Sequence, residues 1–349
     1  MLRLGLLTDT RPGESSAASR SSWYSFSEVN PADAVPRGHS PADVDLSVSV
    51  GTLRLRNPIL AASGTFGYGL EFAHLVNLES LGGFVTKGLS REPIEGAPPP
   101  RVCETASGML NAVGLQNVGV RTFVSEKLPV LRKIDTAVVV NVFGYTLEEY
   151  VEVIRVLEGE EGPAAYELNI SCPNVNKGGM QFGSDPTMAA EVVSAARRAA
   201  VIRPLWVKLS PLVTDIGLIA KAVVEAGADA VTVANTYPAM SLDFRTGKSK
   251  LGNKTGGLSG PAIKPITLRL VWETFKAVNA PILGLGGVET APDVLEYLAV
   301  GATCVQVGTA SFADPQASER LVRELPKAFF EANVFTVNEI RGIFSAENG

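Results

Sequence analysis

The chain has 349 residues, of which 46% are hydrophobic and 19% charged, enough for a sizeable core in one large α/β barrel or in two ordinary domains. The formal net charge is −5 and no basic run is present, so a nucleic-acid partner is not expected. No apolar stretch reaches the roughly 18–20 residues that are needed to span a bilayer, so no membrane association is expected either.

Cysteine and histidine are scarce. The three cysteines, Cys103, Cys172 and Cys304, are far apart and form no C-x-x-C pair. The sequence therefore predicts neither a zinc site nor a disulfide framework, and a reducing cytoplasm is the expected location. The two histidines, His39 and His74, do not suggest a Ser-His-Asp triad or a histidine-rich metal site. Proton transfer must then fall to Cys, Lys, Asp, Glu or Tyr.

The N-terminal 43 residues are rich in Ser, Pro, Arg and Gly and show no sustained period. This composition predicts a mostly disordered leader. A targeting peptide is only weakly indicated, because Asp9 and Glu14 interrupt an acid-poor pattern. Alternation over residues 44–58 around Gly51 predicts a short hairpin. We therefore expect a disordered leader over 1–43 and a folded domain over 44–345.

A regular alternation of short apolar strands and helical patterns follows. Continuously apolar strands indicate a parallel sheet covered on both faces, and eight strand–helix repeats favour a (β/α)₈ TIM barrel with an N-terminal β-hairpin over a doubly wound sheet. Several helices begin at acceptor caps such as Thr146 and Thr214. The predicted strands are 58–63, 83–88, 137–143, 165–171, 204–210, 229–236, 281–286 and 303–308. The predicted helices are 70–80, 121–133, 146–158, 186–200, 214–226, 264–277, 291–300 and 314–332.

Polar residues or glycines occur at the C-terminal end of nearly every predicted strand, which is where such barrels carry their active sites. Gly, Asn and Ser also end strands for reasons of turn geometry, so one such residue would mean little. Lysines at two strand ends and amides at three others predict a ligand cavity. The strand ends hold Ala62–Gly64, Lys87–Gly88, Asn141, Asn169 with Cys172, Lys208, Asn235–Thr236, Gly286–Gly287 and Gly308–Thr309.

Two glycine-containing turns indicate a phosphate site. The seventh strand ends in Gly284-Leu285-Gly286-Gly287 and the eighth in Gly308-Thr309, and the loops after these strands are the recurrent phosphate site of barrels. The spacing is not the G-x-G-x-x-G of dinucleotide folds. A single phosphate, as in flavin mononucleotide (FMN) or a sugar phosphate, fits better; tight turns without a ligand are the alternative. The segment 255–261 could close over the same phosphate or over a ring.

Four asparagines and two lysines can point into one cavity. Asn111, Asn169, Asn174 and Asn235 each present a donor and an acceptor, a pattern that suits a ring with alternating C=O and N–H groups, such as a pyrimidine. Asn111 lies in a glycine-bounded segment that we predict to be a loop. Lys87 and Lys208 offer positive charge for a carboxylate and for the anionic edge of a reduced flavin. Glu167 is the only acidic residue near these strand ends, and alternation places it opposite Leu168.

The thiol of Cys172 is the candidate catalytic group. It lies at a strand end, just before a polar, glycine-containing segment, 173–183, that suits a mobile lid. A thiolate is a usable base near neutral pH. A nucleophile usually needs a base partner such as His, which is not at hand, so we favour proton abstraction. An inert buried thiol is the alternative, and we assign that role to Cys103 and Cys304.

These motifs together resemble the dihydroorotate dehydrogenases, the flavoproteins of pyrimidine synthesis, over about residues 46–340. The strongest match is the segment 168–174, LNISCPN, where the soluble (class 1) branch has its catalytic cysteine. The membrane-attached branch has serine there and an apolar N-terminal helix. Segments 105–117 and 255–265 resemble the NAD-linked subgroup, in which the FMN barrel pairs with a second subunit that carries FAD and a [2Fe–2S] cluster.

The resemblance implies a role for each matching residue. Cys172 would take the C5 proton of dihydroorotate while the C6 hydride goes to flavin N5, and no metal is implied. Ala234 stands where a larger aliphatic residue is expected, which could loosen flavin packing. FMN would be held by Ser63, Lys87, Gly88, Asn141, Asn169, Lys208, Ala234, Gly260, Gly286, Gly287, Gly308 and Thr309. Dihydroorotate would be held by Lys87, Asn111, Ala112, Val113, Gly114, Leu115, Asn169, Asn235 and Thr236, with Asn174 closing from the lid.

Several alternatives remain open at this level. A fumarate-using soluble dihydroorotate dehydrogenase would need no iron–sulfur partner, and a dihydropyrimidine dehydrogenase-like barrel would act on uracil or thymine. A non-catalytic flavin-binding assembly subunit would have no use for a thiol at position 172. The resemblance implies a cytoplasmic homodimer of barrels, extended to a heterotetramer by two partner subunits in the NAD-linked form.

Overall fold

Eight parallel strands close into a barrel in the structure, a computed structural model that describes residues 39–171, 173–174 and 180–346. The strands follow one another around the barrel in chain order, and the last pairs with the first. Each overlaps a strand predicted from the sequence, so the (β/α)₈ architecture is confirmed. The strands are β3 (Ile59–Ala61), β4 (Gly83–Val85), β7 (Ala137–Val142), β8 (Pro163–Asn169), β11 (Leu205–Lys208), β12 (Ala230–Val233), β17 (Ile282–Leu285) and β18 (Cys304–Val307).

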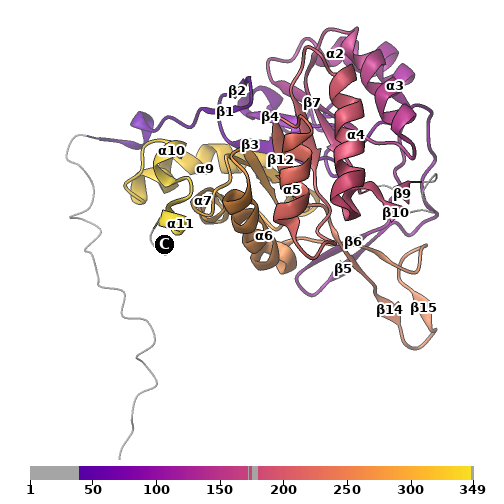
Figure 1. Cartoon of the computed structure of the whole chain (residues 1–349). Helices are drawn as coiled ribbons and strands as arrows, with labels where there is room; N and C mark the ends of the chain where they lie inside the picture. The colour runs from indigo at the N-terminus through magenta and orange to yellow at the C-terminus, as the bar shows by residue number, and fades with distance from the viewer. Residues whose placement is uncertain (1–38, 172, 175–179, 347–349) are drawn as a thin grey trace, which may run out of the picture. The chain divides into compact units, whose positions relative to one another are not determined.

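Helices cover the outside of the barrel, and neighbouring helices from α3 to α6 pack against one another in chain order (Figure 1). The predicted cap at Thr146 is present, since its side chain accepts from the backbone of Glu149. Asp215, rather than Thr214, caps α5. The helices are α1 (Val120–Thr122), the π-helical η3 (Phe123–Lys127), α2 (Leu128–Leu131), α3 (Leu147–Glu158), α4 (Pro186–Ala199), α5 (Ile216–Glu225), α6 (Lys264–Ala277), α7 (Ala291–Ala299), α8 (Ala310–Ala313), α9 (Ala317–Glu331), α10 (Val337–Ile340) and α11 (Ile343–Ala346).

The helix predicted over residues 70–80 is wrong. Only the 3₁₀ turn η2 (Leu78–Ser80) is helical there, and residues 69–76 form successive tight turns. Gly69 has a φ of 85°, and a Cβ at this position would lie 2.6 Å from the ring of Phe84. The chain is therefore pressed against β4, and most of its hydrogen bonds span three residues rather than four. Close approach of the backbone to the barrel thus overrides the helical periodicity of the side chains.

The predicted N-terminal hairpin is present as β1 (Val48–Val50) and β2 (Leu53–Leu55), which pair antiparallel. Gly51 has a φ of 63° at the turn, and a Cβ there would lie 3.2 Å from the Asp229 side chain. Because Asp229 immediately precedes β12, the hairpin lies at the N-terminal end of the barrel strands. That end is opposite the one where the sequence predicts a ligand site.

The last residues of the predicted leader, 39–43, have a defined structure. Ser40 caps the 3₁₀ turn η1 (Pro41–Asp43) in a capping box, and the ring of His39 lies 4.8 Å from that of Phe335. Residues 1–38 lie outside the described residues. The division of the chain at residues 43 and 44 therefore stays a prediction.

A second, antiparallel sheet borders the barrel mouth and was not predicted. Its order is β13 (Tyr237–Ala239), β16 (Gly256–Ser259), β6 (Gly108–Asn111) and β5 (Val102–Thr105). Asn111 therefore ends a strand instead of lying in a loop. Beyond this sheet, β14 (Leu242–Asp243) and β15 (Lys248–Ser249) form a projecting hairpin (Figure 1). The remaining short elements are β9 (Pro173–Asn174), β10 (Met180–Gln181), η5 (Phe182–Ser184) and η6 (Pro261–Ile263).

Side chains alternate between the inside and the outside of the barrel along β8. Tyr166 faces the helices and donates a hydrogen bond to Glu158 at the end of α3, whereas Glu167 is fully buried inside the barrel among residues of other strands. Asn169 lies on the same side as Glu167, one step nearer the C-terminal end. In the part of the chain that the structure describes, no helix is both long and apolar enough to cross a membrane.

Candidate active site

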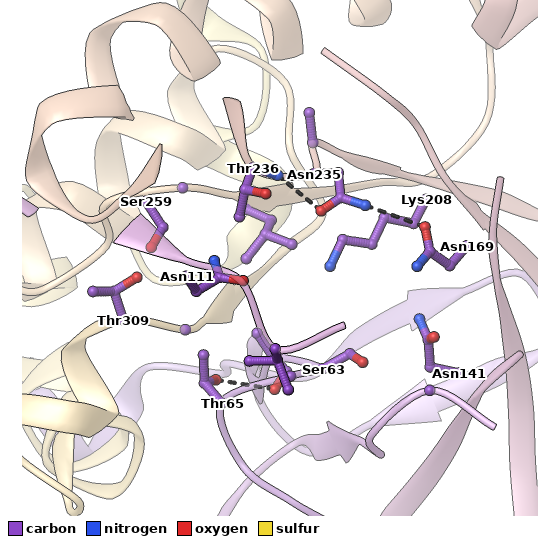
Figure 2. Close-up of a pocket in the computed structure, with 18 of the residues that line it drawn as sticks. Ser63, Thr65, Asn111, Asn141, Asn169, Lys208, Asn235, Thr236, Ser259 and Thr309 are labelled. Carbon is purple, nitrogen blue, oxygen red and sulfur yellow. Dashed lines mark hydrogen bonds between the residues drawn. The ribbon is translucent and has the colours of Figure 1, made fainter. Parts of the chain in front are cut away.

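A cavity opens at the C-terminal end of the barrel (Figure 2). Its empty space measures about 1120 Å³ when the open solvent at its mouth is included. The lining extends over the C-terminal ends of all eight barrel strands. The barrel strand ends line it together with β6 and the segment around β16.

The structure brings most of the predicted site residues together around this cavity. All twelve residues predicted to hold FMN line it, as do seven of those predicted to hold dihydroorotate, two of which, Lys87 and Asn169, belong to both sets. The former are Ser63, Lys87, Gly88, Asn141, Asn169, Lys208, Ala234, Gly260, Gly286, Gly287, Gly308 and Thr309. The additional ones are Asn111, Val113, Leu115, Asn235 and Thr236.

Two predicted residues do not line the cavity. Ala112 is buried, and its N–H donates to the carbonyl of Arg101 at 2.7 Å. Gly114 has a φ of 73°, and a Cβ there would lie 2.3 Å from the backbone nitrogen of Ala97. Both residues fix the backbone of the loop after β6. Val113 and Leu115 in the same loop line the cavity. Cys172 lies outside the described residues, as does the side chain of Asn174.

Bare backbone surrounds one end of the cavity, where the phosphate was predicted. Gly286 and Gly287 have φ values of 152° and 69°, and a Cβ at Gly287 would lie 2.8 Å from the carbonyl oxygen of Gly260. A residue with a side chain would fill this corner and disfavour the backbone conformation. Gly308 and Thr309 complete the lining from β18. Consecutive backbone amides in such a turn are suited to an oxyanion.

Asn235 connects Asn169 and Thr236 through hydrogen bonds along one wall (Figure 2). Asn235 donates from Nδ2 to Oδ1 of Asn169 at 3.1 Å, and its Oδ1 accepts from the backbone of Thr236 at 2.8 Å. The Asn169 oxygen is thereby occupied, which leaves its Nδ2 as a donor. Asn111 donates to the carbonyl of Gly257 at 3.2 Å, which leaves its Oδ1 as an acceptor. Fixed donors and acceptors of both kinds therefore line one cavity.

The two strand-end lysines have different surroundings. Lys208 is 7% exposed; burial lowers its pKa, and the negative charge of Glu167 partly opposes this. Lys87 is half-buried; burial and then the nearby Arg101 lower its pKa, whereas Glu71 raises it. Neither ammonium has a carboxylate within 4.0 Å among the residues that the structure places. Both cations are therefore available to an anionic ligand.

Glu167 forms the centre of a polar layer beneath the cavity that the sequence did not predict. It is fully buried and accepts from Asn141 Nδ2 at 2.8 Å, from Thr232 Oγ1 at 2.7 Å and from Gln306 Nε2 at 2.6 Å. These donors come from β7, β12 and β18. Alternation along β8 gave the inward direction of Glu167, but its partners are set by the neighbours that barrel closure supplies.

Other lining residues were also missed because nothing in their local sequence distinguishes them. Gln116 follows the loop after β6, and Phe143 follows β7. Phe312 lies on the short helix α8 with a half-exposed ring. The lining positions that the sequence did not single out are Thr65, Met109, Gln116, Phe143, Ile263 and Phe312, whereas Ala62, Gly64, Ser259 and Leu285 lie in segments that it did.

The fold and this cavity define a (β/α)₈ barrel with a glycine-lined corner at the ends of β17 and β18 and a wall of lysines and amides beside it. Comparison with known proteins then gives the family. The sequence profile of the family "Dihydroorotate dehydrogenase" matches residues 45–329. The chain belongs to the dihydroorotate dehydrogenase family, as the motifs predicted, and the members of this family are FMN-dependent oxidoreductases.

Individual relatives are similar over nearly their whole length. The chain is 56% identical over 282 residues to a protein of Solibacter usitatus provisionally named dihydroorotate dehydrogenase A (fumarate), covering 81% of this chain and 92% of that protein. It is 51% identical over 298 residues to a protein of Geobacter sp. strain M21 named dihydroorotate dehydrogenase B (NAD(+)), catalytic subunit, covering 85% and 97%. A Trichlorobacter lovleyi protein with the same name is 50% identical over 297 residues, with the same coverage.

The lining fits FMN on three structural grounds. The glycine corner leaves space where a side chain would block a phosphate. Lys208 is a buried cation without a close carboxylate in the described part of the chain, which suits the electron-rich edge of a reduced flavin. The lining extends over the ends of all eight barrel strands and over β6 and β16, which is more than a lone pyrimidine ring can contact.

Proposed function

We propose that this protein is a dihydroorotate dehydrogenase that oxidises (S)-dihydroorotate to orotate in the synthesis of pyrimidines and UMP. One observation carries the proposal: an oxyanion corner, two lysines and an array of oriented amides line a single cavity in a chain of this family. A phosphate site alone would suit many barrels. The adjacent amides indicate a second, flat ligand that bears alternating donors and acceptors.

In this proposal, FMN would occupy the inner part of the cavity. Gly286, Gly287 and Gly308 would hold its phosphate, because backbone N–H groups bind oxyanions. Lys208 would hold the electron-rich edge of the ring system and so favour the reduced, anionic form. When bound, FMN supplies the acceptor for the hydride that leaves C6 of dihydroorotate.

Dihydroorotate occupies the outer part, where its carboxylate is held by Lys87. Asn111, Asn169 and Asn235 then bind the ring amides, because each presents an oriented donor or acceptor to the cavity. Val113, Leu115 and Thr236 complete the wall, with Asn174 closing from the segment that follows β8. Such fixed partners hold the ring in one orientation and so lower the entropic part of the barrier.

Cys172 is proposed as the base that removes the C5 proton. It follows Ile170, which is buried, and Ser171, the last residue placed before it. A thiolate in this role is worth roughly 10²–10⁴-fold in rate. Replacing Cys172 by Ala should therefore reduce reduction of the flavin by dihydroorotate by about that factor at neutral pH, while FMN stays bound. Unchanged turnover in this variant would remove the thiol from the mechanism.

The electron acceptor is proposed to be NAD⁺, reached through a partner subunit that carries FAD and a [2Fe–2S] cluster. Several relatives are named as NAD-linked catalytic subunits, and this proposal includes a cytoplasmic heterotetramer built on a homodimer of barrels. The fumarate-using alternative is supported by the name of one relative. It would operate without the partner subunit.

Anaerobic reduction of the bound flavin tests the whole proposal. The purified protein should be yellow, and excess dihydroorotate should bleach it, whereas dihydrouracil should not. Fumarate should fail to reoxidise the bleached protein, and NADH should reduce it only through the partner subunit. Colourless protein that does not take up added FMN, or bleaching by dihydrouracil alone, would contradict the proposal. Rapid reoxidation by fumarate would leave dihydroorotate oxidation as the proposed reaction and would replace NAD⁺ by fumarate as the electron acceptor.

A further inference from the structure

The buried layer beneath the cavity places a carboxylate where a barrel would ordinarily have apolar side chains. Glu167, Thr232 and Gln306 are all fully buried, and Asn141 is 2% exposed. The carboxylate accepts three hydrogen bonds at 2.6–2.8 Å, and none of them comes from a cation. A buried carboxylate is costly unless it is well paired, and neutral donors leave most of its charge in place.

The amide of Gln306 is oriented in favour of this carboxylate. Its Nε2 donates to Glu167, whereas its Oε1 is buried and has no hydrogen-bond partner among the residues described. An unpaired buried acceptor is unfavourable. The structure therefore leaves one acceptor unsatisfied while giving Glu167 a third donor, which indicates that the layer is built around the negative charge.

The amide of Asn141 connects this buried layer to the cavity. Its Nδ2 is committed to Glu167, so its Oδ1 is the atom that remains for a ligand. That oxygen lies against Gly88, where an added Cβ would be 2.9 Å away. Gly88 and Asn141 both line the cavity. Glu167 thus fixes Asn141 as an acceptor toward the cavity, whereas an unconstrained amide could also turn its donor outward.

The second connection is through charge. Lys208 lies on the neighbouring strand β11 opposite Asn169, and so one inward-facing step beyond Glu167 on the way to the cavity. The two side chains form no ion pair within 4.0 Å, yet the charge of Glu167 opposes the effect of burial on the pKa of Lys208. Glu167 therefore favours the protonated form of Lys208 in the empty cavity.

We propose that Glu167 is a positioning residue for the flavin, which holds Asn141 as an acceptor, holds Lys208 as a cation, and so sets how tightly the protein binds reduced relative to oxidised FMN. The inference rests on the proposed function, because it requires that the cavity binds FMN. Glu167 does not line the cavity, so it acts through these two neighbours.

The test is the midpoint potential of the bound flavin, measured from acid to alkaline pH in wild type and in Glu167→Gln. Glutamine has the same shape and keeps one acceptor for Asn141, while Thr232 and Gln306 can each turn to accept from its amide nitrogen. The variant therefore removes the charge with little change in packing. Apoprotein titration with FMN gives the affinity for the oxidised form independently of turnover.

We expect the two potential–pH curves to cross. At low pH Lys208 is protonated in both proteins, and loss of the negative charge makes the variant's potential higher than that of wild type. As pH rises, Lys208 in the variant loses its proton first, and the preference for reduced flavin falls by tenfold or more. For a two-electron couple, tenfold is about 30 mV.

Matched variants separate this role from a structural one. Glu158→Gln removes another carboxylate with three hydrogen-bond partners that lies outside the cavity lining, and its potential should equal that of wild type at every pH. Asn141→Ala should weaken FMN binding about tenfold. Because this variant keeps both Glu167 and Lys208, its potential–pH curve should not cross that of wild type. Thr232→Val removes one donor from the same layer and leaves the charge, so its curve should not cross that of wild type; a crossing in this variant would overturn the inference even if Glu167→Gln does not fold.

The outcomes are distinguishable. Superimposable curves for wild type and Glu167→Gln, with FMN bound in both, would overturn this inference and leave the proposed function intact. A constant offset at every pH would also overturn it, because such an offset reports the carboxylate's own field without Lys208. Wild-type protein that binds no FMN would instead overturn the proposed function.

Discussion

Two glutamates, the partly buried Glu158 and the fully buried Glu167, each accept three hydrogen bonds, but from different kinds of donor. Glu158 ends α3 and is bound by the Arg203 guanidinium at 3.1 Å, by Tyr166 Oη at 2.6 Å and by the backbone of Ile202. Glu167 is bound by two amides and a hydroxyl. The first carboxylate is paired with a cation at the outer side of the barrel wall, and the second lies inside the barrel beneath the cavity with neutral donors only.

The difference shows how one residue type can serve stability in one place and a ligand in another. An Arg–carboxylate pair satisfies both partners and holds three chain segments together. A carboxylate among neutral donors is satisfied in hydrogen bonding but still acts on any charge nearby, here the Lys208 ammonium. The Glu158 cluster should therefore affect the free energy of unfolding, and the Glu167 cluster should affect the flavin.

Removal of Arg203 should give the largest effect. In Arg203→Met the Glu158 carboxylate, with a side chain only 12% exposed, loses its cation, and breaking a buried pair in this way costs about 3 kcal/mol or more. Urea unfolding of the FMN-saturated protein measures the loss. The flavin spectrum and potential should not change, and a shift in either would contradict the division between the two clusters.

A surface ion pair provides the control for this experiment. Arg269 and Glu273 are 2.6 Å apart on α6, and the Arg269 side chain is 61% exposed. Arg269→Met should cost no more than about 0.5 kcal/mol. Similar losses for Arg203→Met and Arg269→Met would mean that burial adds nothing at Glu158.

Lys208→Met should have the opposite pattern. Loss of a charge-assisted hydrogen bond to the flavin should weaken FMN binding by about 1.5–3 kcal/mol, measured by titrating the apoprotein and following flavin fluorescence. The stability of the apoprotein should stay within about 1 kcal/mol of wild type or rise, since burial disfavours the Lys208 cation. Destabilised apoprotein with normal FMN affinity would show that Lys208 supports the fold instead.

Glu158 should also make the protein sensitive to acid. Burial alone would raise its pKa, but hydrogen bonds from Tyr166, Ile202 and Arg203 outweigh burial, so the pKa lies below its ordinary 4.5. The carboxylate therefore stabilises the fold fully above pH 4.5, and this stability is lost as pH falls through the lowered pKa. Glu158→Gln should cost about 1.5 kcal/mol at pH 7. The urea midpoints of wild type and Glu158→Gln, measured from pH 7 to 4, should converge as the pH falls. A constant difference between the two midpoints would contradict the assignment.

Much of the fold follows from patterns that are local in sequence. The eight barrel strands are short apolar runs such as 137–143, whose hydrophobicity reports burial on both faces. The helix predicted over 70–80 failed because the backbone at Gly69 runs against Phe84, a contact that no periodicity reveals. The sheet containing Asn111 was missed because its strands are short and its partner β16 begins with two glycines.

The candidate site divides in the same way. Strand ends such as Lys87 and Asn169 could be predicted to meet, because parallel strands in a barrel deliver their C-terminal ends to one face. The layer below could not be predicted in full, because Glu167 finds Gln306 only when the eighth strand closes next to the first. Cys172, for which the sequence signal is strong, lies outside the described residues and stays a prediction.

Lys87 extends the comparison to the cations and should show the smallest effect. Burial and Arg101 lower its pKa below the ordinary 10.5, with Glu71 opposing, and unlike Lys208 it is only half-buried. A cation with a lowered pKa loses its charge earlier as pH rises. Orotate affinity should therefore fall above that pKa, by at most about tenfold per pH unit for one proton, when followed through the flavin absorbance from pH 7 upward.

Lys87→Arg isolates this titration, because a guanidinium keeps its charge over the whole range. Any titration of orotate itself is common to both proteins, so the ratio of their affinities reports Lys87 alone. The ratio should be constant near pH 7 and should move in favour of the variant as pH rises. A constant ratio throughout would place the orotate carboxylate on another group; Lys208 would be the next candidate, because it is the other lysine in the cavity lining. Lys87 would then support the fold, as Arg203 does. Only the Glu167 layer, with Lys208, would remain as the place where a charge acts on a ligand.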